Sequence, residues 1–529
     1  ATVQANGTSH GGNIQITTTQ GDINLQSALI QTNGAAGRGG QIAISATNYT
    51  SLESSTLEAT GYTQGGTIKV GNDAQNPVLP FSIFTNLDAA SILNASQTNL
   101  LNTTNGGYIE TSGQTINLLS SINAGRGGMW LLDPANVTIS TTSGTSTGAD
   151  PLLFTNQTNV SASQIQTAIN SGVSVQIITD GTITQSSALA FNVTANGSTP
   201  SLTLDTRSGS IQSITTAAIT DTSSGTGSGV TLNIYTAGGA VTLGATQLKG
   251  SLNVDNTFAV NGSTSGFITI NNAGTYANSS ASGIAIPSNL NISGSINLKS
   301  VTNATNIVAS GIYITATSIE GRQGITISSS SARVEAGFFI NSTTITSAVG
   351  NISITGSTLG SANLGINSTG TITATLGSIS LTGNSLTGNA ITQSGALSAA
   401  TGITVNGSST TASTIVSIGA LTVTGTGAPI SITANNSAAG GNTGITQSGA
   451  ITGANGSDIS FTSNNIISQN GAITLAANTS GNTATLLYDT TSGNKSSTIL
   501  SGTLTLTTGS TSDINFVMKS AGSAINPGA

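Results

Sequence analysis

Residues 106–140 read GGYIETSGQTINLLSSINAGRGGMWLLDPANVTIS, and this segment shows how the chain is built. It contains the only tryptophan, Trp130, within the apolar run 129–132, and Asp133-Pro134 ends that run. On either side stands the phrase Gly-x-Ile-x-(Leu/Ile), in which alternate residues are apolar and the others are Thr, Ser, Asn or Gln. Strict alternation after a glycine is typical of a β-strand, and proline ends a strand because it cannot donate to the ladder. The segment therefore predicts a unit of one glycine turn and one short strand.

The same phrase recurs along the whole chain. Examples lie at 12–16, 21–25, 40–44, 66–70, 239–243, 266–270, 294–298, 350–354 and 502–506. One phrase is too short to bury an apolar face alone, whereas phrases stacked on one another bury a continuous core. The repetition predicts an all-β fold, a right-handed parallel β-helix in which each turn of the chain adds strands to the turn before it.

Composition narrows the function further. Only 5% of the 529 residues are charged, against roughly 25% in an ordinary domain, and 36% are hydrophobic, which argues against disorder. The net charge of −7 is spread thinly, with no basic stripe, so nucleic-acid binding is not expected. The chain has no cysteine for a disulfide or a thiolate. No apolar run approaches the ~18 residues of a membrane span, so the chain is not expected to cross a membrane.

The pattern divides the chain into three parts. Residues 1–140 form an N-terminal β-helix portion that includes a surface loop excursion at 76–105, with a short helical turn expected at 89–93. Residues 141–175 form a linker that carries one short helix, and residues 176–529 form the β-helix shaft.

Within the shaft, the phrase Gly-Ala-(Leu/Ile) returns at Gly395, Gly419, Gly449 and Gly471. The gap from Gly419 to Gly449 is the longest of the three, and we interpret it as holding a loop insertion at 438–441. The two shorter gaps suit one coil of a β-helix. A coil of about 24 residues and a strand spacing of ~4.8 Å predict a rod about 100 Å long.

The helix of the linker is expected at 161–170. Ile165, Ala168 and Ile169 recur there at helical spacing. Ser161 or Ser163 would cap its N-terminus, and a glycine at 172 would end it.

The phrases ETSG at 110–113, WLLDP at 130–134 and NVTIS at 136–140 carry a resemblance to known proteins. In this combination they resemble the large exoproteins of two-partner secretion, in particular the filamentous haemagglutinin and high-molecular-weight adhesin group. The likeness extends from about residue 12 to about residue 189. It implies a short helix after WLLDP, export through an outer-membrane secretion partner, and adhesion to cells or surfaces. The Asn-Pro-Asn-Gly phrase of the family's secretion domain does not occur, so we expect the chain to be a mature or excised piece of a longer precursor.

Residues suited to catalysis are scarce. His10 is the only histidine, so neither a zinc site nor a Ser-His-Asp arrangement is supported. The 17 acidic residues are scattered singly; Glu53 and Glu58 come nearest to a cluster, and we interpret them as part of a solvated loop. No calcium-binding repeat or phosphate loop occurs. The sequence predicts no enzyme activity, no cofactor and no metal.

Two arginines stand in Gly-Arg-Gly-Gly turns before strands, Arg38 and Arg126. The simpler interpretation is a loop arginine that donates to backbone carbonyls or to a nearby carboxylate. The alternative is a pair that binds a ligand.

Asn-x-Ser/Thr sequons are frequent, and sugars at such sites occur in some high-molecular-weight adhesins. Candidate glycosylation sites are Asn6, Asn48, Asn94, Asn102, Asn136, Asn156, Asn192, Asn196, Asn261, Asn291, Asn341 and Asn406.

Together these features predict a protein of the bacterial cell surface or extracellular matrix, an adhesin shaft that attaches to a receptor on host cells, surfaces or matrix. One alternative is a subunit of an extracellular filament or sheath, because open strand edges at the ends of a β-helix invite head-to-tail self-association. A second alternative is the stalk of a contact-dependent toxin or of a haem-scavenging exoprotein.

Overall fold

The structure is a computed structural model of the whole chain, which divides into two compact units, Ala1–Ser263 and Thr264–Ala529. It describes all residues except 73–78, 100–104, 142–157, 208–211, 237–240, 245, 256–267, 271–283, 287–289, 293–294, 303–311, 315, 332–335, 359–363, 412–413, 437–442, 478–482, 492–497, 509–512, 521–524 and 527–529. The sequons at Asn102, Asn156 and Asn261, the loop insertion predicted at 438–441 and residues 142–157 of the predicted linker therefore lie outside the described residues.

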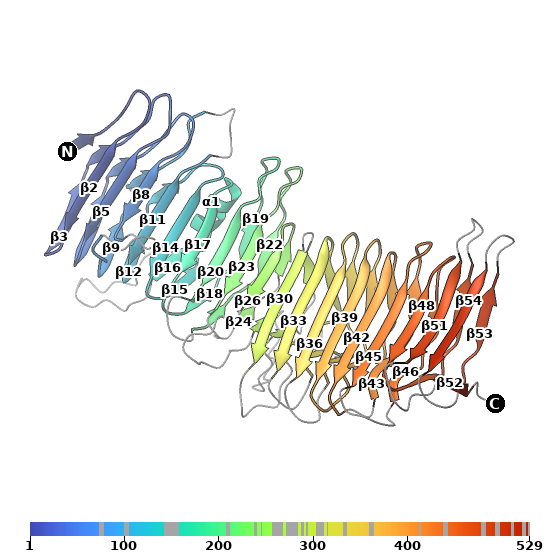
Figure 1. Cartoon of the computed structure of the whole chain (residues 1–529). Helices are drawn as coiled ribbons and strands as arrows, with labels where there is room; N and C mark the ends of the chain where they lie inside the picture. The colour runs from blue at the N-terminus through green and yellow to red at the C-terminus, as the bar shows by residue number, and fades with distance from the viewer. Residues whose placement is uncertain are drawn as a thin grey trace. The chain divides into compact units, whose positions relative to one another are not determined.

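Each unit is a parallel β-solenoid, so the predicted parallel β-helix is confirmed (Figure 1). The strands of one coil pair in parallel with those of the next, as β36 (Ile352–Thr358) does with β39 (Ser378–Ser385). Ile352 and Ile354 of β36 and Ile379 of β39 point inward and are at most 1% exposed. The alternate residues Ser, Thr and Asn point outward, as the period of two in the sequence predicts.

The first unit contains five sheets. Sheet 1 consists of β1 (Thr2–Gln4), β4 (Leu29–Gln31), β7 (Thr56–Glu58), β10 (Ile92–Asn94) and β13 (Ser121–Asn123). Sheet 2 consists of β2 (Asn13–Thr18), β5 (Gln41–Ala46), β8 (Thr67–Val70), β11 (Tyr108–Gly113), β14 (Met129–Pro134), β17 (Ser174–Ile178), β20 (Ser201–Asp205), β23 (Thr231–Tyr235) and β26 (Leu252–Asp255). Sheet 3 consists of β3 (Asp22–Gln26), β6 (Tyr49–Glu53), β9 (Phe84–Leu87) and β12 (Thr115–Leu118). Sheet 4 consists of β16 (Thr158–Ser161), β15 (Val137–Ser140), β18 (Ile183–Gln185), β21 (Ile214–Thr215) and β24 (Val241–Leu243), and sheet 5 of β19 (Leu189–Phe191), β22 (Ile219–Asp221) and β25 (Thr246–Leu248).

The second unit contains three rows of strands. Sheet 6 consists of β30 (Ser295–Thr302), β33 (Gly324–Ser331), β36, β39, β42 (Gly402–Ser409), β45 (Ile430–Asn436), β48 (Ile459–Ser463), β51 (Ala484–Thr490) and β54 (Ile514–Ser520). Sheet 7 consists of β27 (Ile268–Ile270), β28 (Ile284–Ile286), β31 (Ile312–Ile314), β34 (Phe338–Ile340), β37 (Ile366–Ser368), β40 (Ile391–Gln393), β43 (Thr414–Ile418), β46 (Thr443–Gln447), β49 (Ile466–Gln469), β52 (Thr498–Leu500) and β55 (Ile525–Asn526). Sheet 8 consists of β29 (Leu290–Ile292), β32 (Ser318–Gly321), β35 (Thr344–Ser347), β38 (Thr371–Ala374), β41 (Leu397–Ala399), β44 (Leu421–Val423), β47 (Ile451–Thr452), β50 (Ile473–Ala476) and β53 (Leu504–Thr507).

Coil length varies more than the sequence suggested. Ile325 pairs with Ile352, and Ile352 with Ile379, so these two coils are equal in length and slightly longer than the coil expected from the glycine phrases. The Gly-Ala-(Leu/Ile) phrases mark the corner between sheets 7 and 8. At that corner the buried amide of Gln393 donates to the carbonyls of Gly370 and Gly395, both at 2.9 Å. The corner is therefore fixed by a side chain, and the loops elsewhere in the coil change in length.

The prediction of a surface loop excursion at 76–105 is wrong for the central part of this segment. That part contains two regular strands, β9 and β10, which pair with strands of the coils before and after them. Leu87 and Leu93 are fully buried. In place of the helical turn predicted at 89–93, a turn at 89–90 leads into β10, which begins at Ile92. These strands have no glycine directly before them, and this is why the repeat phrase did not reveal them.

The predicted helix is confirmed as α1 (Ala162–Asn170). The Ser161 hydroxyl caps it by accepting from the Ser163 amide at 3.2 Å, and Ile165, Ala168 and Ile169 are buried. It is the only helix among the residues that the structure describes, and it is too short to cross a membrane.

The helix α1 stands where a strand would be expected, because it contacts both β13 of sheet 1 and β19 of sheet 5. Its side chains provide the bonds that a strand would make with its backbone. The Gln166 and Asn170 side-chain oxygens accept from the amides of Ala190 and Asn192, at 3.0 and 2.7 Å. The first unit therefore continues its stack through a helical coil.

Candidate functional site

Two of the three phrases that carry the family resemblance lie side by side. The strand β11 contains ETSG and β14 contains WLLDP, and the two strands pair in register from Tyr108 and Met129 to Gly113 and Pro134. Residues from two separate phrases of the sequence are thus direct neighbours in sheet 2. We call β11 and β14 the motif strands.

The inner side of the motif strands is built around the tryptophan. Trp130 is fully buried, and its indole Nε1 donates to the Thr111 hydroxyl at 3.2 Å. This bond satisfies the one polar group of a large core side chain. The inner side is therefore a packing site.

The outer side of the motif strands carries a polar cluster around Glu110, which is fully buried. The Ser112 hydroxyl donates to Glu110 Oε1 at 2.9 Å, and the Tyr108 hydroxyl donates to Oε2 at 3.1 Å. Lys69 of β8 is the register partner of Glu110, and its Nζ lies 5.9 Å from the centre of the Tyr108 ring. A buried carboxylate is stabilised by such hydroxyl donors and by a neighbouring cation.

Asp133 adds a second carboxyl group to this outer side, opposite Ser112. Burial, aided by the charges of Glu110 and Asp180, raises the pKa of Asp133 to about 7, and a hydrogen bond with the Asn72 side chain opposes this rise. The sequence showed only scattered acidic residues, yet the register places Glu110 and Asp133 on one face of adjacent strands. No group of three metal-ligating side chains exists within the described part of the chain. Because the pKa of Asp133 is raised to about 7, its carboxyl group can hold or release a proton near neutral pH.

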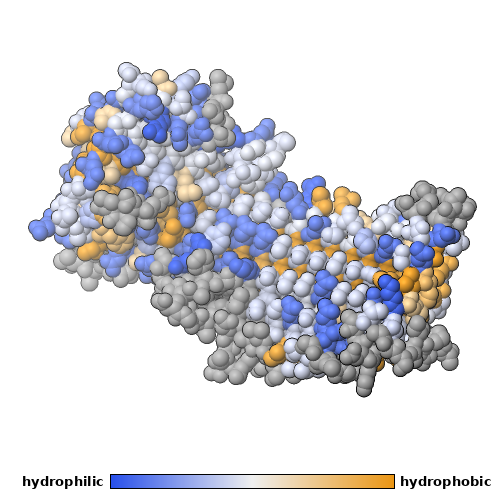
Figure 2. Space-filling model, in the orientation of Figure 1, coloured by the Kyte–Doolittle hydropathy of each residue, from blue (hydrophilic) through white to orange (hydrophobic). Residues whose placement is uncertain are grey.

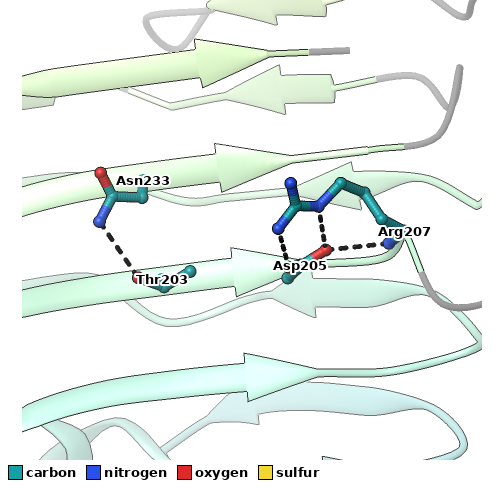
Figure 3. A network of polar contacts seen from close by, with 4 residues as sticks. All are labelled: Thr203, Asp205, Arg207 and Asn233. Carbon is teal, nitrogen blue, oxygen red and sulfur yellow. Dashed lines mark hydrogen bonds and ion pairs between the residues drawn. The ribbon is translucent and has the colours of Figure 1, made fainter. Parts of the chain in front are cut away.

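A second polar network lies on β20 and β23 of the same sheet (Figure 3). Arg207 binds Asp205 with two bonds, Nε to Oδ1 at 2.9 Å and Nη2 to Oδ2 at 2.6 Å, and the Arg207 amide donates to Oδ1 at 3.0 Å. The guanidinium also lies 4.4 Å from the centre of the Tyr235 ring. The hydrogen bonds to Asp205 raise the pKa of Arg207. Beside this pair, the Asn233 amide donates to the Thr203 hydroxyl at 3.1 Å. These groups bind one another, and the network therefore braces the sheet.

The structure separates the two arginines of the Gly-Arg-Gly-Gly turns. Arg126 donates to the carbonyl of Asn196, which confirms the simpler interpretation for this residue. Its side chain also passes close to Gly172, where an added Cβ would lie 2.8 Å from Arg126 Cγ. Arg38 is exposed in an earlier coil, where its backbone forms a bridge with Gln64. The two therefore do not form the alternative ligand-binding pair.

The prediction of a solvated loop at Glu53 and Glu58 is wrong. Glu53 is the last residue of β6, and its carboxylate accepts from the side-chain amide of Gln26 at 3.0 Å. Glu58 is the last residue of β7, and its carboxylate accepts from the side-chain amide of Gln31 at 2.6 Å. Their partners stand one coil earlier in each case, so both carboxylates belong to side-chain ladders along the solenoid. His10 is exposed and lies 2.8 Å from the Ser9 hydroxyl through Nδ1.

The candidate glycosylation sites differ in exposure. Exposed sites are Asn6, Asn48, Asn192, Asn196, Asn341 and Asn406. Half-buried sites are Asn94 and Asn136, and Asn291 lies in β29, where its side chain is not described. Accessibility therefore favours the first group as acceptors.

No family model matches the chain, and no curated protein matches it. The resemblance carried by the motif strands thus stays a prediction.

The proximity of Glu110 and Asp133, on one face of adjacent strands, was not predicted from the sequence. The signal that could have revealed it is the spacing of the two phrases, which is close to the length of the shortest coils. Had that spacing been treated as one coil, ETSG and LLDP would have been aligned as neighbours.

Proposed function

We propose that the chain is the shaft of a secreted bacterial surface protein of the filamentous haemagglutinin and high-molecular-weight adhesin group, and that it mediates attachment. The observation that carries the proposal is the in-register stacking of the two resemblance phrases on the motif strands. If this chain and the adhesin group share a fold, the same two phrases should lie in the same two coils. Neighbouring coils of a parallel β-solenoid would keep the spacing between the phrases constant.

The chemistry of the outer faces supports this proposal. In sheet 8 of the second unit, one outward position carries a hydroxyl on seven successive strands. These residues are Thr346, Thr373, Ser398, Thr422, Thr452, Thr474 and Thr505. On the visible face of this unit, pale side chains of near-neutral hydropathy cover much of the surface (Figure 2). Many weak, uncharged contacts of this kind add up through multivalency, and salt screens them little.

The proposal includes partners outside this chain. It implies export through an outer-membrane secretion partner, a receptor on host cells, surfaces or matrix, and sugars at exposed sequons such as Asn192 and Asn406. The chain's own role is non-enzymatic: it presents contacts at a distance from the cell.

The test is an attachment assay with the purified chain coupled to beads. Beads are flowed over cultured epithelial cells, extracellular matrix proteins and abiotic surfaces at about 50 to 500 mM salt. We expect retention that changes little with salt, and a loss of retention when Thr422 and Thr452 are both changed to Lys. As the matched control, two outward residues of sheet 6, Thr382 and Thr404, are changed to Lys, and retention should then be unchanged. Retention no higher than that of beads carrying an unrelated β-solenoid, on every surface, would refute the proposal. Sugars are tested separately, by the intact mass of protein from its native host.

A further inference from the structure

Two buried oxygen atoms at the corner between sheets 7 and 8 have no hydrogen-bond partner among the residues that the structure describes. Gln393, the last residue of β40, is 1% exposed, and its Oε1 accepts no hydrogen bond. Ser368, the last residue of β37, is fully buried, and its hydroxyl likewise makes no hydrogen bond. The two residues are register partners on adjacent coils. The two oxygen atoms therefore belong to neighbouring positions of one inward column, and we call this place the corner site.

The orientation of the Gln393 side chain is fixed by its own donor. Its Nε2 donates to the carbonyls of Gly370 and Gly395, both at 2.9 Å. Exchanging the oxygen and the nitrogen of this amide would place Oε1 against two carbonyl oxygens, which cannot donate. A buried acceptor that stays unsatisfied is costly, because it has lost its hydrogen bonds to solvent. Gln393 Oε1 therefore needs a donor from elsewhere.

Gln447 shows how the same corner satisfies the glutamine oxygen where a protein donor is within reach. Its Nε2 donates to the carbonyl of Gly449, and its Oε1 accepts from the Gly471 amide at 3.2 Å. In the coil that follows Gln393, the Gly419 amide donates instead to the backbone carbonyl of Gln393, at 2.6 Å. The backbone of the next coil thus supplies a donor to Gln447 Oε1 and supplies none to Gln393 Oε1.

Apolar residues flank the corner site on both sides along the solenoid. Ile340 stands before Ser368 in the inward column and is fully buried, and Ile418 stands after Gln393 and is 1% exposed. The two oxygen atoms are therefore shielded from bulk solvent. The column carries no charged residue from Ile340 to Ile418, so a cation would find no carboxylate there to balance its charge. A small neutral molecule that can both donate and accept suits the corner site better.

We propose that the corner site binds one water molecule, which donates to Gln393 Oε1 and accepts from the Ser368 hydroxyl. Buried waters typically make about two to four hydrogen bonds to polar groups that have no other partner. This water satisfies both oxygen atoms and adds a side-chain link between β37 and β40, which already pair through their backbones. The inference does not depend on the proposed attachment function, because it uses only interior atoms of the second unit.

The direct test is a high-resolution crystal structure of the full chain. We expect an isolated peak of electron density about 2.7–3.0 Å from both Gln393 Oε1 and Ser368 Oγ. A Ser368 hydroxyl that donates directly to Gln393 Oε1, with no density between them, would overturn the proposal. So would a peak with anomalous scattering in crystals grown in rubidium chloride, because this would identify a monovalent cation in place of water.

Oxygen-17 magnetic relaxation dispersion tests the corner site in solution, because it counts water molecules that stay buried for longer than the protein takes to tumble. Gln393→Met keeps the length of the side chain but removes the acceptor, and the count of long-lived waters should fall by about one. The matched control is Gln447→Met, which removes an oxygen that already has a protein donor and should leave the count unchanged.

An equal count in the unchanged chain and in Gln393→Met, or an equal fall in both variants, contradicts the proposal. Circular dichroism with thermal melting shows whether each variant is folded. If Gln393→Met does not fold, the crystal structure of the unchanged chain decides by itself, since it requires no substitution.

Discussion

Asp133 makes the stability of the first unit depend on pH near neutrality. The test is the substitution Asp133→Asn, which keeps the shape of the side chain and its hydrogen bond to Asn72 but removes the charge. Burial, with help from Glu110 and Asp180, raises the pKa of Asp133 from 3.8 to about 7. A protonated Asp133 is therefore compatible with the fold, and an ionised one is disfavoured.

The sign and size of the effect on the free energy of unfolding follow from this pKa shift. Because the folded-state pKa is the higher one, the stabilising contribution is fully present below about pH 4 and is lost as pH rises from there through about 7. About three pKa units correspond to at most about 4 kcal/mol in the free energy of unfolding. Asp133 is half-buried, so solvent screening reduces this figure, and about 2–4 kcal/mol is a reasonable range. For a unit of this size, roughly 2 °C per kcal/mol gives a melting-point change of about 4–8 °C.

The assay is differential scanning calorimetry of both proteins at intervals from pH 5 to pH 8. We expect Asp133→Asn to melt about 4–8 °C above the unchanged chain at pH 8, with the gap narrowing toward pH 5. Subtracting the two curves removes titrations that they share. Asp22→Asn serves as the control, because Asp22 is exposed and should give parallel curves. Parallel curves for Asp133→Asn as well would refute the reasoning.

Three further substitutions probe the surroundings of α1 and the motif strands. Gly172→Ala should lower stability by about 1–3 kcal/mol in urea unfolding, since Gly172 has φ 87° and a crowded Cβ position, whereas Gly197→Ala, with φ 65° and open space, should cost less. Trp130→Phe should cost about 1–3 kcal/mol by circular dichroism, because it removes the indole donor; an unchanged midpoint would contradict this. Gln166→Ala should speed hydrogen exchange at the backbone amide that Gln166 accepts from, and exposed Thr167→Ala should leave that amide protected.

The solenoid could be predicted from the sequence because its determinants are local. Apolar residues alternate after a glycine, as in 350–354, and this places Ile352 and Ile354 in the core whatever the rest of the coil does. The determinants of helix α1 are equally local, because its cap at Ser161 and its apolar face lie within one short stretch of sequence. The strands β9 and β10 escaped detection because neither follows a glycine.

The polar cluster could not be predicted in the same way. Glu110 and Asp133 meet only through the register of two strands, and register depends on loop lengths that the repeat phrase does not encode. The sequons could be found, but their exposure could not: Asn136 is half-buried because its side chain accepts from the Thr182 amide at 2.9 Å.

The position of the motif strands within the solenoid explains why so much unusual chemistry gathers there. Trp130 pairs with Ile109 across a short coil and with Val175 across a coil about twice as long, which contains the inserted strand β16 and the helix α1. A regular stack of coils is held by apolar columns and needs no charge, whereas an abrupt change of coil length leaves backbone groups that side chains must satisfy. Gln166 and Asn170 of α1 do so by accepting from backbone amides, while Trp130 and Glu110 bind side-chain hydroxyls of the motif strands. A brace of this kind has to remain rigid. Attachment to a surface is therefore better sought on the outward hydroxyl rows of the second unit than at the phrases that carry the resemblance.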